Sequence, residues 1–216
     1  MPDLPPPPLV PGPCIEQGLR AAGRPTSNGS IVSEVYPIRV HWEDDDDQAM
    51  AIEVLALLEL SWAVQVDELG FQPPALPDGK DGPEFDFYIV PGNGWSAYAL
   101  APAEADTNPG DGYMSSPAFV AMDSIYGTDE EALRQTVPHE FNHVLQWATD
   151  FTEWTLPVWE AVATAAQQWT LQTDSGWESV VPDFQEAPWA PTLVGDSETL
   201  WSEHEVGWNY EYGAAL

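Results

Sequence analysis

Basic residues are scarce in this chain. Five Lys and Arg stand against thirty-six Asp and Glu over 216 residues, which gives a formal net charge of −31. Such a charge excludes nucleic acid and anionic membranes as electrostatic partners, because their surfaces are negative as well. The acidic residues are spread along the sequence, a pattern typical of a strongly solvated surface. We therefore expect an extracellular or cell-surface protein.

Cysteine and long apolar runs are lacking too. Cys14 is the only cysteine, so no disulfide can form within the chain. No stretch of eighteen apolar residues is present, which predicts no transmembrane span. The N-terminus has no basic region followed by an apolar one, as a signal peptide would. If the protein is exported, we expect its true start to lie upstream of this sequence.

Proline is concentrated at the beginning. MPDLPPPPLVPGPC contains seven Pro, which predicts an extended and poorly ordered leader over residues 1–29. The rest of the chain is different, since 44% of all residues are hydrophobic and eleven are Trp. We predict one folded domain over residues 30–216.

Apolar periodicity predicts both strands and helices in that domain. A helix should follow the acidic run at 44–47 and end before Gly70, because its apolar residues recur at steps of three and four. Short β-branched and aromatic segments predict strands. The predicted strands are Ile38–Trp42, Phe85–Val90, Trp95–Leu100 and Ala118–Asp123.

Acidic residues near turns raise the question of Ca²⁺. The run at 44–47 lacks the spacing of an EF-hand loop, whereas acidic residues at the start of a helix are favoured by its dipole. Four loop residues leave Ca²⁺ binding open, although ordinary turn chemistry accounts for them as well. These are Asp78, Asp81, Asp106 and Asp111.

The run HEFNH, from His139 to His143, has the strongest chemical implication. Independent placement of the His and Glu of this chain predicts about 0.006 such matches, so composition does not explain it. On a helix, residues i and i+4 share one face, so both imidazoles can bind one metal ion while Glu140 lies beside it. This H-E-x-x-H spacing is typical of zinc peptidases. It also occurs in proteins without metal, so the surrounding sequence has to decide.

The sequence around the motif predicts a helix. Thr128 and Glu131 have the spacing of a capping box, so the helix should begin there and run to about Ala148. Pro138 removes one hydrogen bond inside it, and we expect a kink or a fresh start at that residue.

The two faces of this helix differ. At 100° per residue, His143 lies about 40° from His139, whereas Val137, Phe141 and Val144 cluster on the opposite side. A metal-binding face opposite a core face is therefore predicted.

A catalytic zinc ion usually has three protein ligands and a water. Metzincins take the third from H-E-x-x-H-x-x-G-x-x-H, but Gln146 and Thr149 occupy the Gly and last His positions, which excludes that class. The better candidate is Glu160, in a second predicted helix that opens at Pro157. Glu153 lies nearer, and we interpret it as an ordinary loop acid.

The second helix repeats the division into two faces. Small or polar residues, Ala163 and Thr164, share the side of Glu160, which would allow the two helices to approach closely. Val162 and Trp169 lie opposite and are predicted to face the core.

These residues resemble a known group. His139-Glu140-x-x-His143 followed by Glu160 in a W-E-A-x-A context resembles the gluzincin branch of zinc metallopeptidases. The chain over about 38–216 is also similar to a little-characterised family of predicted secreted bacterial metalloproteases. The similar stretches are RVHWEDD, LELSW, LGFQPPALPDG, FDFYIV, HEFNHVLQW, VWEAVAT and EYGAAL.

The resemblance implies an α+β, zincin-like fold, with a mixed twisted sheet, the motif helix beneath it and the third ligand on the following helix. It implies an edge strand lining the active site, here Ala118–Asp123. It further implies that EYGAAL opens another helix, so we expect a chain truncated at its C-terminus.

The leading hypothesis is a zinc-dependent endopeptidase that acts on a protein or peptide. His139, His143 and Glu160 would hold one Zn²⁺, and Glu140 would act as general base. The resemblance implies a further donor over the oxyanion, for which Tyr212 is our choice ahead of His204 and Tyr210.

Two other hypotheses stay open. One is a catalytically inactive metal-binding module for adhesion or assembly, which a Trp-rich C-terminal segment and the acidic surface would suit. The other is a polar network without metal. For His41, at a strand end, a structural role is expected.

Overall fold

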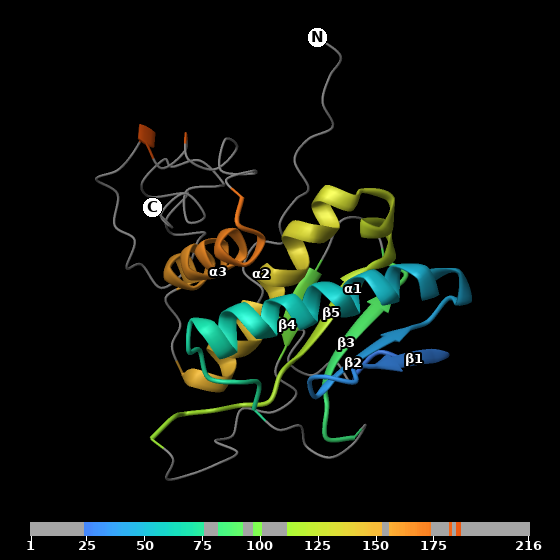
Figure 1. Cartoon of the computed structure of the whole chain (residues 1–216), viewed down its shortest axis with the longest axis horizontal. Helices are drawn as coiled ribbons and strands as arrows, with labels where there is room; N and C mark the ends of the chain where they lie inside the picture. Colours follow the sequence, from blue (N-terminus) through green and yellow to red (C-terminus); the bar gives the residue numbers. More distant parts are fainter. Residues whose placement is uncertain are drawn as a thin grey trace.

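Five strands form one mixed sheet, and helices α1 (Gln48–Ser61) and α2 (Glu130–Thr149) pack against it (Figure 1). The computed structural model describes residues 24–75, 82–92, 97–100, 112–152, 156–173, 182 and 185–186. Helix α3 (Leu156–Leu171) packs in turn against α2. The predicted α+β class is therefore confirmed.

The centre of the sheet is parallel. β2, β3 and β5 run in the same direction, and β1 and β4 pair antiparallel at the two edges, in the order β1-β2-β3-β5-β4. The four predicted strands are present, and β1 is an addition that the sequence analysis did not separate from β2. The bounds are β1 Gly29–Val32, β2 Ile38–Trp42, β3 Phe85–Val90, β4 Ala97–Leu100 and β5 Phe119–Asp123.

The predicted edge strand is wrong. β5, which covers the expected Ala118–Asp123 segment, lies inside the sheet between β3 and β4. Every residue of β5 is buried, as expected of a strand with neighbours on both sides and side chains covered on both faces. The edge strand on this side is β4, which pairs with β5 from Ala97 opposite Met122 to Leu100 opposite Phe119.

Helix α1 confirms the first predicted helix. It spans Gln48–Ser61, continues as a π-helical segment over Trp62–Glu68, and ends before Gly70, whose φ of +79° suits glycine. A 3₁₀ turn, Asp45–Asp47, leads into α1, and the Asp44 side chain caps this turn by accepting a hydrogen bond from the backbone of Asp46.

The helical run Asp45–Glu68 is long and apolar enough to cross a membrane by length and composition, since an 18-residue window within it has a mean hydropathy of 1.6. The same property is common in core helices of soluble proteins. Here α1 contacts β1, β2, α2 and α3, and residues such as Val54 and Leu58 are fully buried. Its buried side is thus accounted for by packing within the domain.

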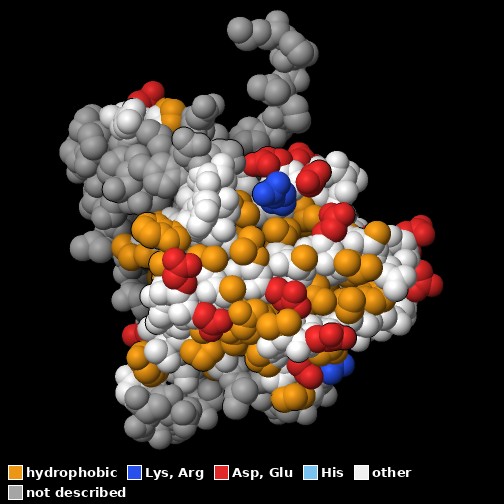
Figure 2. Space-filling model, in the orientation of Figure 1, with side chains coloured by type: hydrophobic (Ala, Val, Ile, Leu, Met, Phe, Trp, Pro, Cys, Tyr) orange, Lys and Arg blue, Asp and Glu red, His pale blue; other side chains and the backbone are white. Residues whose placement is uncertain are grey.

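The outer side of α1 faces solvent. Figure 2 shows hydrophobic side chains there mixed with Asp and Glu, and little Lys or Arg. Ile52 and Leu60 are 53% and 43% exposed. The spread of acidic residues predicted from the sequence is visible on this face.

The main core lies between the helices and one face of the sheet. Phe141 of the motif helix is fully buried at its centre, with its ring 5.9 Å from that of Trp62 and 5.7 Å from that of Phe85. Alternate residues of β3, namely Phe85, Phe87 and Ile89, contribute to the same core. This packing fixes α2 relative to the sheet.

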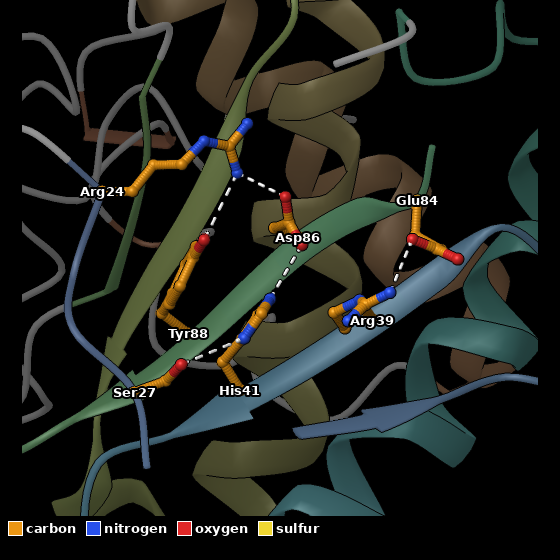
Figure 3. A network of polar contacts seen from close by, with 7 residues as sticks. All are labelled: Arg24, Ser27, Arg39, His41, Glu84, Asp86 and Tyr88. Carbon is orange, nitrogen blue, oxygen red and sulfur yellow. Dashed lines mark hydrogen bonds and ion pairs between the residues drawn. The ribbon is translucent and has the colours of Figure 1, made fainter. Parts of the chain in front are cut away.

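The other face of the sheet carries a buried polar network (Figure 3). Asp86 accepts hydrogen bonds from Arg24 and from His41 Nε2, the latter at 2.8 Å. His41 stacks on Tyr88 with ring centroids 4.4 Å apart, and Ser27 Oγ lies 3.3 Å from its Nδ1. The structure thus gives His41 structural contacts, away from the H-E-x-x-H motif.

Residues 24–29 belong to this side of the domain. Arg24 pairs with Asp86 and lies over the Phe119 ring, and Asn28 bonds through its backbone to Trp42. From its Pro and Gly content, this segment was predicted to belong to the poorly ordered leader. Amino-acid composition cannot show the specific contacts that hold the segment against the sheet.

Candidate metal centre

Helix α2 carries the motif and spans Glu130–Thr149. Its cap differs from the prediction, because Asp129, not Thr128, accepts hydrogen bonds from the backbone of Glu131 and Ala132. Thr128 Oγ1 instead donates to the Ile125 carbonyl in the preceding 3₁₀ turn. Asx and Thr side chains compete for the same role, and here the backbone of the turn places Asp129 at the cap.

The helix continues through Pro138, which rules out the fresh start, one of the two outcomes expected at this residue. The Pro138 carbonyl accepts a hydrogen bond at 3.0 Å from Gln65 Nε2 of the π-helical segment. Packing on both sides of α2 holds the helix across this residue, as neighbouring contacts can.

Both faces of α2 are buried. Val137, Phe141 and Val144 face the core as predicted, and each is fully buried. The motif side is covered as well, with His139 5% and His143 2% exposed. The site therefore lies inside the protein, between α2 and α3.

Helix α3 spans Leu156–Leu171 and supplies Glu160, which is 2% exposed. Ala163 is fully buried and Thr164 nearly so, as expected of the side that meets α2. The prediction for the opposite side is wrong, because Trp169 is 61% exposed and Val162 is only half-buried. α3 packs on α2 through its Glu160 face, and among the described elements no strand covers its apolar outer side.

Three ligand atoms converge between these helices. Glu160 Oε2 lies 3.0 Å from His139 Nε2 and 3.4 Å from His143 Nε2, and the two imidazole Nε2 atoms are 3.1 Å apart. A tetrahedral zinc site with bonds of about 2.0–2.1 Å separates its ligand atoms by about 3.3 Å. The three side chains thus form a group that could hold one metal ion, and the distances between their ligand atoms are close to those of a zinc site.

Glu140 projects beside this group. It is 1% exposed, and its Oε2 has no hydrogen-bond partner among the described residues. Burial raises the pKa of Glu140, and the negative charge of Glu160 adds to this, whereas both motif histidines and the Ala99 backbone act the other way. A buried carboxylate oxygen without a partner fits a water or metal-bound group at this position.

Glu160 titrates in the opposite direction. Burial alone would raise its pKa, but the charge of His143 and hydrogen bonds from both histidines outweigh burial and hold the pKa of Glu160 well below its usual range. The carboxyl is therefore ionised at neutral pH, the form in which it can bind a cation.

Gln65 is a site residue that the sequence analysis missed. It is fully buried, donates to Thr170 Oγ1 at 3.1 Å, and accepts from Asn142 Nδ2 of the motif at 3.1 Å. Together with its bond to Pro138, these contacts join the π-helical segment, α2 and α3 at the level of the motif. The sequence did contain a sign of this role. Gln65 follows Leu58 by seven residues, so it lies on the same side of the helix and places a polar residue in an otherwise apolar stripe.

Several other positions named in the sequence analysis are not described by the structure. Tyr212, His204, Tyr210 and Glu153 lie outside the described residues, as do the four loop aspartates considered for Ca²⁺. Asp150 ends α2, where its side chain accepts from Thr152.

No protein-family model, curated protein or solved structure matches this chain. The resemblance to gluzincins therefore stays a prediction, and a function has to be argued from the residues of the site.

Proposed function

We propose that this protein is a secreted, zinc-dependent endopeptidase with a zincin-like domain. The observation that carries the proposal is the convergence of His139, His143 and Glu160 at ion-sized separations, with the Glu140 carboxylate beside them. Two imidazoles and one carboxylate are a donor set known from catalytic zinc sites, which keep a fourth position for water.

Zinc bound there would supply an activated water and polarise the scissile carbonyl. Glu140 is suited to the proton transfer, because burial raises its pKa above that of an exposed glutamate and its Oε2 is unpartnered among the described residues. It would take the proton of the attacking water and deliver it to the leaving amine. Such general acid–base catalysis contributes about 10²- to 10⁴-fold in rate.

The position of β4 supports a peptide as substrate. β4 is the edge strand beside α2, and the Ala99 backbone hydrogen bonds to Glu140. An extended peptide that pairs with an edge strand gains main-chain hydrogen bonds along its length. A peptide added to β4 would therefore pass next to the proposed general base.

The test is the substitution Glu140→Gln in the full chain. We expect it to lower cleavage of a broad peptide library by about 100-fold or more, while elemental analysis still finds one zinc per chain. Glu130→Gln is the matched control, because Glu130 is an exposed residue of the same helix. Unchanged cleavage in Glu140→Gln would refute the catalytic assignment, and absence of zinc from the wild-type protein would refute the metal site.

Burial favours a second candidate function. His139, Glu140, His143 and Glu160 are each no more than 5% exposed, so a substrate has little access to them in this conformation. A metal-binding module that serves adhesion or assembly needs no such access. Stoichiometric zinc together with no cleavage of any library peptide would support this alternative.

A further inference from the structure

Gln146 lies one turn after His143 and touches both ligand-bearing helices. Its Oε1 is 2.7 Å from His143 Nδ1, and its Nε2 donates to the Trp159 carbonyl at 2.9 Å. Trp159 immediately precedes Glu160 on α3, and its ring stacks near that of His143, with centroids 6.4 Å apart. One side-chain amide thus connects a proposed ligand with the residue next to another.

The hydrogen-bonding groups fix the direction of each bond. A backbone carbonyl can only accept, so the Trp159 oxygen requires the NH₂ group of Gln146 on its side. The amide oxygen of Gln146 then faces His143, and this oxygen can only accept as well. His143 Nδ1 must therefore carry a hydrogen.

When this ring binds a metal ion, Nδ1–H is its single N–H, and Nε2 has the lone pair that would bind the ion. This is the atom that lies 3.1 Å from His139 Nε2 and 3.4 Å from Glu160 Oε2. The bond to Gln146 thus leaves the ligand nitrogen directed at the metal position. Outer partners of this kind commonly fix the tautomer and ring orientation of a metal-binding histidine.

We propose that Gln146 is a positioning residue of the metal centre, which selects the Nδ1–H tautomer of His143 and ties the start of α3 to α2 beside Glu160. This inference rests on the metal site proposed above. In the sequence alone, Gln146 only marks a departure from the metzincin pattern.

Two substitutions separate the two tasks of the amide. Gln146→Met has a similar length and removes both hydrogen bonds. Gln146→Glu retains an acceptor for His143 Nδ1–H and loses the donor to the Trp159 carbonyl. Gln135→Met is the matched control, because Gln135 is on the same helix and its amide bonds only to exposed Glu131 among the described contacts.

The tautomer is read by long-range ¹H–¹⁵N NMR of the histidine rings in the zinc-free full-length protein. We expect a hydrogen on Nδ1 of His143 in the wild type, in Gln135→Met and in Gln146→Glu, and a smaller population of this Nδ1–H in Gln146→Met. Zinc affinity, measured by competition with a chelator, should be about 10- to 100-fold weaker in Gln146→Met. Circular dichroism checks that each variant is folded.

An unchanged His143 tautomer in Gln146→Met, or a zinc affinity within twofold of the wild type, would overturn the inference. The NMR readout needs no metal. Failure of the wild type to bind zinc would refute the proposed function, and the tautomer would still test the role of Gln146. If Gln146→Met does not fold, a Gln146→Glu protein that has lost the Nδ1–H tautomer would overturn it as well.

Discussion

Replacement of Asp86 by Asn should destabilise the domain strongly, because the buried network on the second face of the sheet depends on its charge. Asp86 is 1% exposed and accepts from Arg24 and His41 through its two oxygens. An Asn side chain offers one acceptor oxygen, and its NH₂ group would face the other donor. The Arg24 guanidinium, with its side chain 9% exposed, would also lose this counter-ion.

The expected cost is about 3 kcal/mol. Removal of one partner of a buried ion pair costs about 3–5 kcal/mol, and loss of a hydrogen bond to a charged group costs about 1.5–3 kcal/mol. Both ranges describe the same loss here, and they meet at about 3 kcal/mol. For a domain of this size, a loss of about 3 kcal/mol corresponds to a fall in Tm of about 6–12 °C. It is also a large part of a typical total stability of about 5–15 kcal/mol.

Glu84→Gln is the control on the same sheet. The pair of Arg39 and Glu84 has its N and O atoms 3.0 Å apart, but the side chains are 26% and 16% exposed. Water and salt screen such a pair, so its loss should cost under about 1 kcal/mol. Urea denaturation measures both variants, and the slope m checks that they unfold from comparable states. A cost for Asp86→Asn no greater than that of Glu84→Gln would refute the reasoning.

Three further predictions concern the helices. Phe141→Ala should cost about 3–5 kcal/mol because it removes the ring at the centre of the core, while Trp169→Ala, at an exposed position of α3, should cost under about 0.5 kcal/mol by the same urea assay. Gln65→Met should cost about 1–3 kcal/mol, since the buried amide of Asn142 loses its acceptor, and equal stability to wild type would contradict this. Burial raises the pKa of Asp47, and the negative charges of neighbouring aspartates raise it further. Its contribution to stability is therefore fully present below the unfolded pKa of about 4 and is lost as pH rises through the folded pKa. Asp47→Asn should therefore raise Tm at pH 7 and have little effect at about pH 3, and the reverse order in thermal scans would contradict the sign.

Local patterns predicted the elements well. Strands at Ile38–Trp42 and Phe85–Val90 have the predicted bounds, because short β-branched and aromatic runs between turn residues are read from adjacent residues alone. The motif helix was predicted from its capping box and periodicity. Its cap lies one residue later than predicted, at Asp129, and the helix continues through Pro138. Such errors are small because they depend on a single turn.

Long-range order was predicted less well. The position of β5 inside the sheet depends on which strands pair, and those partners lie nineteen or more residues away in the sequence. The exposure of Trp169 was not predicted for the same reason. Helical periodicity shows which side of a helix is apolar, but it does not show which element will cover that side. Gln65 and Gln146 acquire their roles only through contacts with other helices.

The sequence by itself determined that His139 and His143 share one face with Glu140 beside them, because helical periodicity is a local property of the backbone. The sequence also indicated Glu160 as the third ligand, but not its position relative to the two histidines. Only the packing of α3 on α2 brought that carboxylate to 3.0 Å from His139, and only the surrounding burial raised the pKa of Glu140 while the two histidines lowered that of Glu160. Distances between helices and the desolvation of charges arise from the tertiary structure as a whole, so no single segment of sequence contains them.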